Sequence, residues 1–153
     1  MKKVTGVIFA GGYGKRLLPL TESTPKPLLE LKEGHTILDK QILDFKYAGI
    51  SEVYLLVGHL ADKIRDRYDD SYHGVKLKYL VEDKPMGTLH ALSNALKHIK
   101  NDIVVRNGDV VSDANIKELV KRAQAGEDLI TIVVTKMQSP FGIVEFSDRK
   151  VIS

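Results

Sequence analysis

Glycines and small residues cluster directly after the first apolar stretch of the chain, in the run Ala10-Gly11-Gly12-Tyr13-Gly14. Glycines allow a backbone to approach a phosphate closely and to point several amide groups at it. In an open α/β sheet, the loop at the carboxyl end of a strand lies where ligands bind. This run is therefore a candidate phosphate site, although a plain tight turn would use the same glycines.

Two familiar phosphate-binding motifs do not fit this loop. A P-loop requires a glycine where Phe9 stands and a hydroxyl residue where Arg16 stands. A dinucleotide-binding fingerprint requires a third glycine in place of Leu17, and Pro19 is unfavourable for a helix that should begin there. The loop must bind phosphate in another way, if it binds phosphate at all.

The stretch that follows the glycines, residues 16–29, carries three prolines and two cations. Because proline removes a backbone donor and restricts its neighbour, we expect an extended segment rather than a regular helix. Pro25 and Pro27 stiffen the backbone on both sides of Lys26, and rigid placement suits an ammonium that stabilises a phosphate. The guanidinium of Arg16 could contact several phosphate oxygens at once. The alternative is a proline-rich surface loop with solvated cations.

A carboxylate, Asp109, follows another apolar stretch in the run Arg106-Asn107-Gly108-Asp109. A carboxylate at the carboxyl end of a strand is well placed to hold Mg²⁺, which prefers oxygen ligands together with substrate phosphates. Asp109 could equally be a helix cap or a turn residue.

Apolar, β-branched stretches alternate with helix-like stretches along the chain, which predicts an α/β sandwich with a mostly parallel sheet in one domain. Gly49 and Gly126 would end two of the helices. A terminal hairpin is expected from residues 141–146 and 149–152, turning at Ser147-Asp148. The expected strands are 5–9, 53–57, 76–81, 103–105 and 129–134, and the expected helices are 38–48, 61–68, 89–99 and 114–125.

Composition excludes several classes of protein. The chain has 153 residues, of which 43% are hydrophobic and 28% charged, as in ordinary globular domains. No apolar run approaches the roughly 20 residues that span a bilayer, so no membrane partner is expected. The net charge of +3 and the lack of an arginine-rich, aromatic-interleaved run argue against nucleic acid as a partner. The absence of cysteine favours a cytoplasmic location.

Residues 11–29 resemble the signature of the sugar-phosphate nucleotidyltransferase family: Gly-Gly-x-Gly-x-Arg-Leu-x-Pro-Leu-Thr, a short spacer, and Pro-Lys-Pro-Leu. The resemblance extends along the chain from Val4. It implies a three-layer α/β/α sandwich with a Rossmann-like sheet. It also implies that this is the N-terminal part of a longer domain, because the family continues with a Glu-Lys-Pro segment and a second metal-binding aspartate.

The resemblance implies a role for individual residues. Arg16, Lys26 and Asp109 are expected to be catalytic: Arg16 at the pyrophosphate end, Lys26 at the α-phosphate, and Asp109 as ligand of the Mg²⁺ cofactor. The nucleotide would be bound by Ala10, Gly11, Gly12, Gly14, Glu82, Pro85, Gly87 and Thr88, and the sugar by Asn107 and Gly142. The chain departs from the family at Lys15, Leu18 and Phe141, where a small hydroxyl residue, arginine and tyrosine are frequent.

The resemblance implies transfer of a nucleoside monophosphate unit from a nucleoside triphosphate to a sugar 1-phosphate, with release of pyrophosphate. Two alternatives stay open: a nucleotide-binding regulatory module without transfer activity, and a relative that uses a non-sugar phosphate such as phosphocholine. The sequence leaves open which nucleobase and which sugar are used and whether the chain forms a homo-oligomer.

Overall fold

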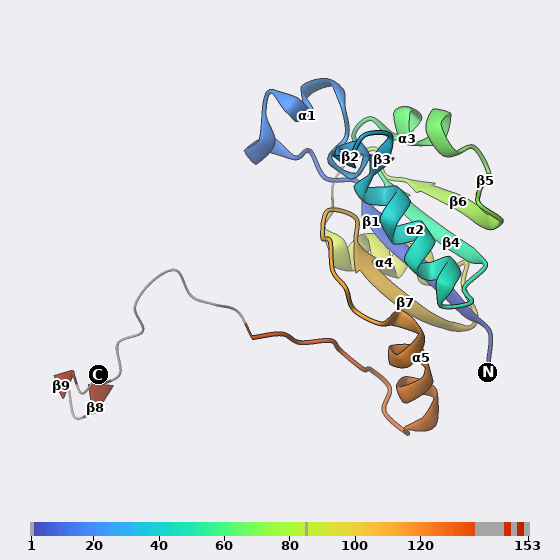
Figure 1. Ribbon diagram of the computed structural model, residues 1–153, viewed down its shortest axis with the longest axis vertical. Helices are drawn as coiled ribbons and strands as arrows, with labels where there is room; N and C mark the ends of the chain where they lie inside the picture. Colours follow the sequence, from blue (N-terminus) through green and yellow to red (C-terminus); the bar gives the residue numbers. More distant parts are fainter. Residues whose placement is uncertain (1, 85, 137–145, 148–149, 152–153) are drawn as a thin grey trace.

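The computed structural model describes residues 2–84, 86–136, 146–147 and 150–151 (Figure 1). Among these residues, five strands form one sheet in the order β5-β6-β4-β1-β7. β1 pairs in parallel with β4 and β7, β4 pairs in parallel with β6, and only the short β5 is antiparallel. The expected mostly parallel sheet is thus confirmed. The strands are β1 (Val4–Ala10), β4 (Glu52–Val57), β5 (Ser71–Tyr72), β6 (Val75–Val81) and β7 (Asp102–Asn107).

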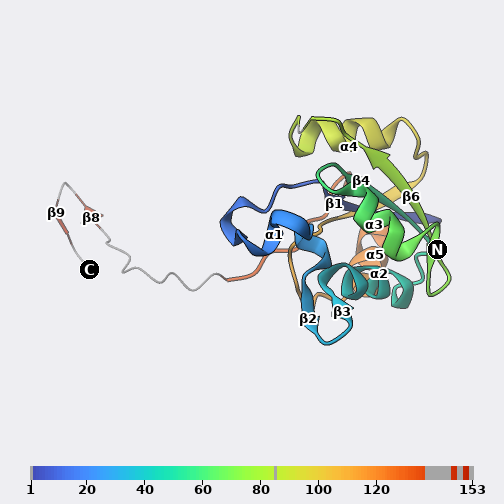
Figure 2. The same cartoon turned by 90° about the horizontal axis from the view of Figure 1, so that it is seen from above.

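Helices cover both faces of the sheet, as Figure 2 shows from above. One face, which includes Ile8 of β1, packs against α2 (Ile37–Tyr47), α3 (Ala61–Tyr68) and α5 (Ile116–Ala125). The other face, which includes Val7, packs against α4 (Thr88–Leu96). Val7 and Ile8 are both fully buried. The near-continuous apolar character of β1 therefore reflects burial on both sides, as in other parallel sheets.

The four expected helices all form, with small changes at their ends. α2 begins after Thr36, whose hydroxyl accepts a hydrogen bond from the amide of Asp39, while the Asp39 carboxylate accepts one from the amide of Thr36. This reciprocal capping box starts the helix one residue earlier than predicted. The helix ends before Gly49, which has a φ of +83°.

The segment with the prolines is not extended, so that expectation was wrong. It folds into three short helical turns, since proline is tolerated in the first turn of a helix, where its missing amide has no partner to lose. These turns are η1 (Lys15–Leu17), α1 (Leu20–Ser23) and η2 (Lys26–Leu28). A small antiparallel pair, β2 (Glu30–Lys32) and β3 (His35–Thr36), then leads into α2.

The strand expected at 129–134 is also not formed. Figure 1 shows this segment running away from the sheet, and the side chains of Leu129 and Ile132 are 101% and 74% exposed. β-branched residues favour a strand only where a neighbouring strand and a packed face receive them, and the described residues place neither beside this segment.

Of the expected terminal hairpin, β8 (Phe146–Ser147) pairs antiparallel with β9 (Lys150–Val151). The remainder lies outside the described residues. None of the helices in the described part of the chain combines the length and the apolar character needed to cross a membrane.

Candidate nucleotide-binding site

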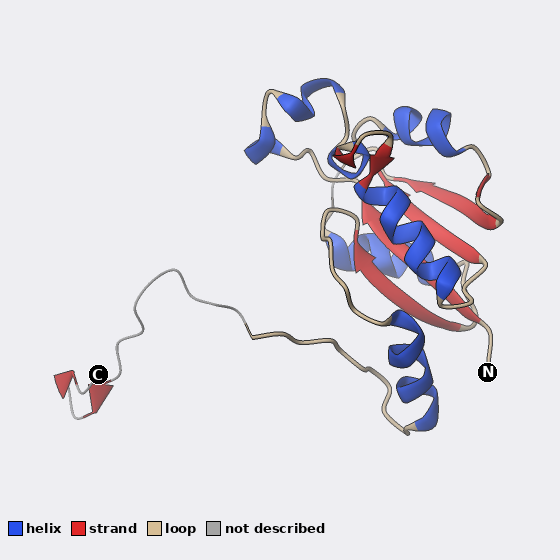
Figure 3. Ribbon diagram, in the orientation of Figure 1, coloured by secondary structure: helices blue, strands red, loops and turns tan. Residues whose placement is uncertain are grey.

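A cleft of about 460 Å³ opens at the carboxyl ends of the central strands. Figure 3 shows the loops that follow β1 and β7 at the same end of the sheet. The volume of the cleft is within the range of small-molecule binding sites. The cleft is lined by Phe9, Ala10, Gly11, Gly12, Tyr13, Gly14, Lys15, Arg16, Leu17, Lys26, Pro27, Leu56, Glu82, Gly87, Thr88, Ala91, Asn107 and Asp109.

The glycine loop forms one wall of the cleft. Gly14 adopts a left-handed conformation with a φ of +64°, which favours glycine, and its carbonyl accepts a hydrogen bond from the hydroxyl of Thr21 at 2.9 Å. This bond ties the glycine loop to α1 in the proline segment. The two parts of the signature, adjacent in sequence, therefore form one connected structure at the end of β1.

The cation of the proline segment meets the carboxylate that follows β7. Lys26 Nζ lies 2.8 Å from Asp109 Oδ2, although the residues are 83 positions apart in sequence. Their side chains are 25% and 41% exposed, so both remain accessible from the cleft. Arg16 is exposed and lines the same cleft. The structure thus brings the three expected catalytic residues together, and their roles stay predictions.

Asp109 owes its place to Gly108. The amide of Gly108 donates to the carbonyl of Phe9 at 2.7 Å, which anchors the turn after β7 to the end of β1. A Cβ atom on residue 108 would lie only 2.4 Å from that carbonyl oxygen. No other residue type fits without displacing the turn, so this glycine fixes the height of Asp109 above the sheet.

The opposite wall carries the residues expected to contact the nucleobase. Glu82, Gly87 and Thr88 line it beside the apolar side chains of Leu56 and Ala91. Nδ1 of His90 donates to Oε1 of Glu82 at 2.9 Å, and the Glu82 side chain is only 18% exposed. Apolar side chains next to an oriented carboxylate suit an aromatic base with hydrogen-bond donors on its edge.

Two expected site residues, Pro85 and Gly142, lie outside the described residues. Asn107, expected to contact the sugar, lines the cleft at the end of β7.

The sequence prediction missed Tyr13 as a lining residue. Its ring lies 5.0 Å from the ring of His59, and Lys15 Nζ lies 5.6 Å from its centre. An aromatic side chain inside a glycine run was the signal that could have identified it.

The donor set at Asp109 would suit a metal ion shared with substrate phosphates rather than one held by protein side chains alone. No group of three or more potential metal ligands occurs among the described residues. Mg²⁺ is commonly held by one or two carboxylates together with substrate phosphates and water. Asp109 follows the end of β7 and its side chain is partly exposed, so it could supply one carboxylate to a site of that kind.

Sequence and structure comparisons agree on the family. The family described as nucleotidyl transferase matches residues 5–153. The chain is 37% identical over 147 residues to a mannose-1-phosphate guanyltransferase of Kluyveromyces lactis, covering 91% of this chain and 40% of the relative. It is 30% identical over 153 residues to a D-glycero-alpha-D-manno-heptose 1-phosphate guanylyltransferase of Campylobacter jejuni, covering 95% and 65%.

Solved structures show the same architecture. A putative glucose-1-phosphate thymidylyltransferase of Bacillus anthracis superposes with a TM-score of 0.83 at 26% identity, over 97% of this chain and 62% of that one. HddC of Yersinia pseudotuberculosis, complexed with GMP-PN, superposes with a TM-score of 0.68 at 29% identity, over 78% and 53%. The chain therefore spans between 40% and 65% of the length of these four relatives.

Proposed function

Because the chain belongs to the nucleotidyl transferase family, we propose that it forms the nucleotide-binding part of an enzyme that joins a nucleoside monophosphate to a sugar 1-phosphate and releases pyrophosphate. The observation that carries this proposal is the 2.8 Å contact between Lys26 and Asp109 across a glycine-lined cleft. An ammonium and a carboxylate beside a glycine loop form an arrangement that suits a metal-bound triphosphate.

The reaction requires an in-line exchange at the α-phosphorus. An oxygen of the sugar phosphate forms a bond to that phosphorus while the bond to the bridging oxygen of the β-phosphate breaks, and its electron pair leaves with pyrophosphate. The attacking phosphate is already ionised, so no general base is needed. The protein's contribution is positioning and electrostatic stabilisation of the developing charge.

Each charged residue then has a defined task. The Lys26 ammonium stabilises the non-bridging oxygens of the α-phosphate, and Arg16 stabilises the departing pyrophosphate. The glycine loop, with Gly11 and Gly12 in the wall of the cleft, directs amide groups at the remaining phosphate oxygens. Asp109 would hold Mg²⁺, which would supply positive charge that neutralises the phosphates.

The nucleobase we propose is guanine. An ionised carboxylate only accepts hydrogen bonds, and guanine is the base that offers two adjacent donors, on N1 and N2, to a single carboxylate. Glu82, held by His90 at 2.9 Å, provides such an acceptor on the base side of the cleft. Two of the relatives are guanylyltransferases by name, and HddC was solved with a guanine nucleotide analogue.

The names of the same two relatives point to a mannose- or heptose-type sugar 1-phosphate. Asn107 at the end of β7 and Gly142 are the residues proposed to contact it. The absence of cysteine and the small net charge are compatible with a cytoplasmic enzyme that handles small molecules rather than nucleic acid.

A substrate panel tests the proposal. Pyrophosphate release is measured with GTP, UTP, dTTP and CTP, each with mannose 1-phosphate, a heptose 1-phosphate, glucose 1-phosphate and phosphocholine, in the presence of Mg²⁺. We expect release with GTP and one of the first two acceptors. Nucleotide binding by calorimetry without release under any pairing would support a regulatory module instead, and release with phosphocholine alone would support the non-sugar alternative.

A further inference from the structure

One buried amide side chain contacts the turn that carries Asp109. Gln41 lies in the middle of α2 and is fully buried. Its Nε2 donates to the carbonyl oxygen of Asn107 at 2.7 Å and to that of Val110 at 2.9 Å. Because both partners are carbonyl oxygens, only the nitrogen end of the amide can face them, so the orientation of the side chain is determined by its partners.

The two carbonyls stand on either side of Asp109. The turn is also closed by the amide of Val110, which lies 3.3 Å from the carbonyl of Asn107, and it is anchored to β1 through Gly108. The backbone of Asp109 is therefore held from two directions, by β1 on one side and by Gln41 of α2 on the other. Neither contact involves the Asp109 carboxylate, which lies in the cleft beside Lys26.

The same face of α2 holds the outer part of this loop. Asp44, one turn after Gln41, accepts from Lys40 at 2.6 Å and from Arg106 at 2.8 Å. Arg106 also donates to the hydroxyl of Ser112 at 3.2 Å. The loop from β7 towards α5 is thus bound to α2 by a series of polar contacts.

Packing of α2 alone would favour an apolar residue at position 41. Its neighbours Leu38 and Ile42 are fully buried apolar residues, and its own Oε1 is buried without a hydrogen-bond partner. A buried unpaired acceptor costs free energy that an apolar side chain would avoid. The two hydrogen bonds to the Asp109 turn offset this cost.

On the basis of the function proposed above, we infer that Gln41 is a positioning residue for nucleotidyl transfer, which holds the Asp109 carboxylate at the place where it binds Mg²⁺ together with the nucleotide. Residues that orient a metal ligand without touching the metal typically change metal affinity or activity by about 10- to 100-fold when they are replaced. Replacement of Gln41 is therefore expected to change Mg²⁺-dependent binding of the nucleotide, and not the contacts with the base or the glycine loop.

The test compares Gln41→Met, which keeps the length and volume of the side chain, with the wild-type full chain. Binding of GTP is measured by calorimetry over a range of Mg²⁺ concentrations and also in EDTA, and the melting temperature is recorded. We expect Gln41→Met to need about tenfold more Mg²⁺ for half-maximal tightening of GTP binding, with binding in EDTA changed less than about twofold.

Gln124→Met is the matched control, because Gln124 also donates from Nε2 to a backbone carbonyl, that of Lys2, away from the cleft. It should leave the Mg²⁺ dependence unchanged. Should Gln41→Met not fold, Gln41→Asn, which retains an amide with shorter reach, takes its place.

A folded Gln41 variant with a lowered melting temperature and the wild-type Mg²⁺ dependence would overturn the inference and leave Gln41 a purely structural residue. A wild-type chain whose GTP binding does not respond to Mg²⁺ would instead overturn the proposed function. The two failures are therefore distinguishable.

Discussion

At the scale of single residues, the contact between Lys26 and Asp109 defines the chemistry of the cleft. Each side chain neutralises the other at 2.8 Å. On the proposed function, a metal-bound triphosphate would draw the ammonium to phosphate oxygens and the carboxylate to Mg²⁺, so neither charge would be left unpaired. Such an exchange would leave no buried, uncompensated charge in the cleft.

Replacing Lys26 by alanine should remove the stabilisation of charge on the α-phosphate. We expect kcat to fall by about 10²- to 10³-fold, equivalent to about 3–4 kcal/mol of transition-state stabilisation. Steady-state kinetics with GTP and the accepted sugar 1-phosphate measures the effect. Lys117→Ala, on the exposed side of α5, is the control, and near-normal turnover of the Lys26 variant would remove it from the catalytic residues.

Glu82 allows a test of base recognition. In Glu82→Gln, one of the two acceptors for guanine becomes an amide donor, which complements the alternating donor and acceptor edge of uracil or thymine. We expect kcat/KM for GTP to fall by about 10- to 100-fold, since each good polar pair contributes about 1–3 kcal/mol, while UTP or dTTP gains relative to GTP. Equal losses for all nucleotides would show that Glu82 does not read the base.

At the scale of elements, the sequence predicted the repeating pattern well and the long-range contacts poorly. The apolar stretches at 53–57 and 76–81 and the helix at 61–68 correspond closely to β4, β6 and α3. The patterns that predict these elements lie within each short stretch of sequence. By contrast, the pairing of Lys26 with Asp109 and of Gln41 with the same turn depends on the β1-α2-β7 packing, which no short window of sequence contains.

The mistakes also have physical causes. The segment 129–134 has the composition of a strand, yet its side chains are exposed, because strand formation needs a partner that composition cannot supply. The prolines of residues 16–29 predict an extended segment, whereas proline at the start of a short helical turn is compatible with that turn. In both cases the residue types were interpreted without the neighbours that decide the outcome.

Gly108→Ala tests the turn as an element. The added methyl group would lie 2.4 Å from the carbonyl oxygen of Phe9 and must push β7 and β1 apart or move the turn. We expect a loss of about 1–3 kcal/mol in the free energy of unfolding, as for other overpacked sites, together with weaker Mg²⁺-dependent nucleotide binding. Chemical denaturation and calorimetry give the two quantities.

Gly126→Ala, after α5, has no atom closer than 3.7 Å to the added carbon and serves as the comparison. If both glycine variants behaved alike, the close approach of the turn to β1 would not be a constraint on the site.

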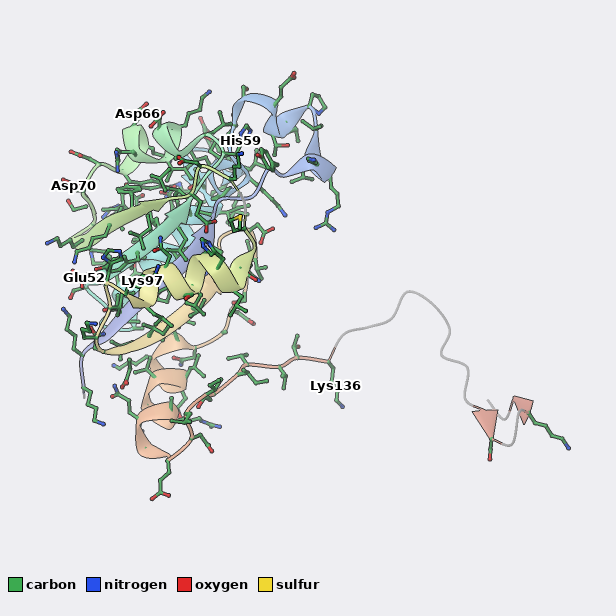
Figure 4. All side chains as sticks on the ribbon, turned by 180° about the vertical axis from the view of Figure 1, so that it is seen from behind. Glu52, His59, Asp66, Asp70, Lys97 and Lys136 are labelled. Atoms are coloured by element: carbon green, nitrogen blue, oxygen red, sulfur yellow. The ribbon has the colours of Figure 1, made fainter. Side chains whose placement is uncertain are left out.

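At the scale of the whole molecule, an ion pair far from the cleft is expected to contribute to the pH dependence of stability. Figure 4 labels Glu52 and His59 at opposite ends of the sheet. Glu52 lies 2.9 Å from Lys78 and 3.5 Å from Lys3, and the hydrogen bond from Lys78 is the main cause that holds the pKa of Glu52 below its ordinary value of 4.5.

A carboxylate with a lowered pKa in the folded state stabilises the fold above its ordinary pKa and loses this effect as pH falls through the lower value. We therefore expect Glu52→Gln to reduce the free energy of unfolding at pH 7 by less than about 1 kcal/mol. The difference from wild type should shrink as the pH falls below the ordinary pKa of 4.5. Denaturation curves at pH 7, 5 and 3 provide the check, and a constant difference at all three values would contradict it.

On the proposed function, the ion pair in the cleft would also link the affinities of two ligands. A cation bound by the Asp109 carboxylate would release the Lys26 ammonium for the triphosphate, and an anion bound by Lys26 would free the carboxylate in the same way. Since such coupling is reciprocal, each ligand must tighten the other by an equal factor. On the proposed function, scarce metal would therefore weaken the binding of GTP, and the occupancy of the site would depend on both concentrations.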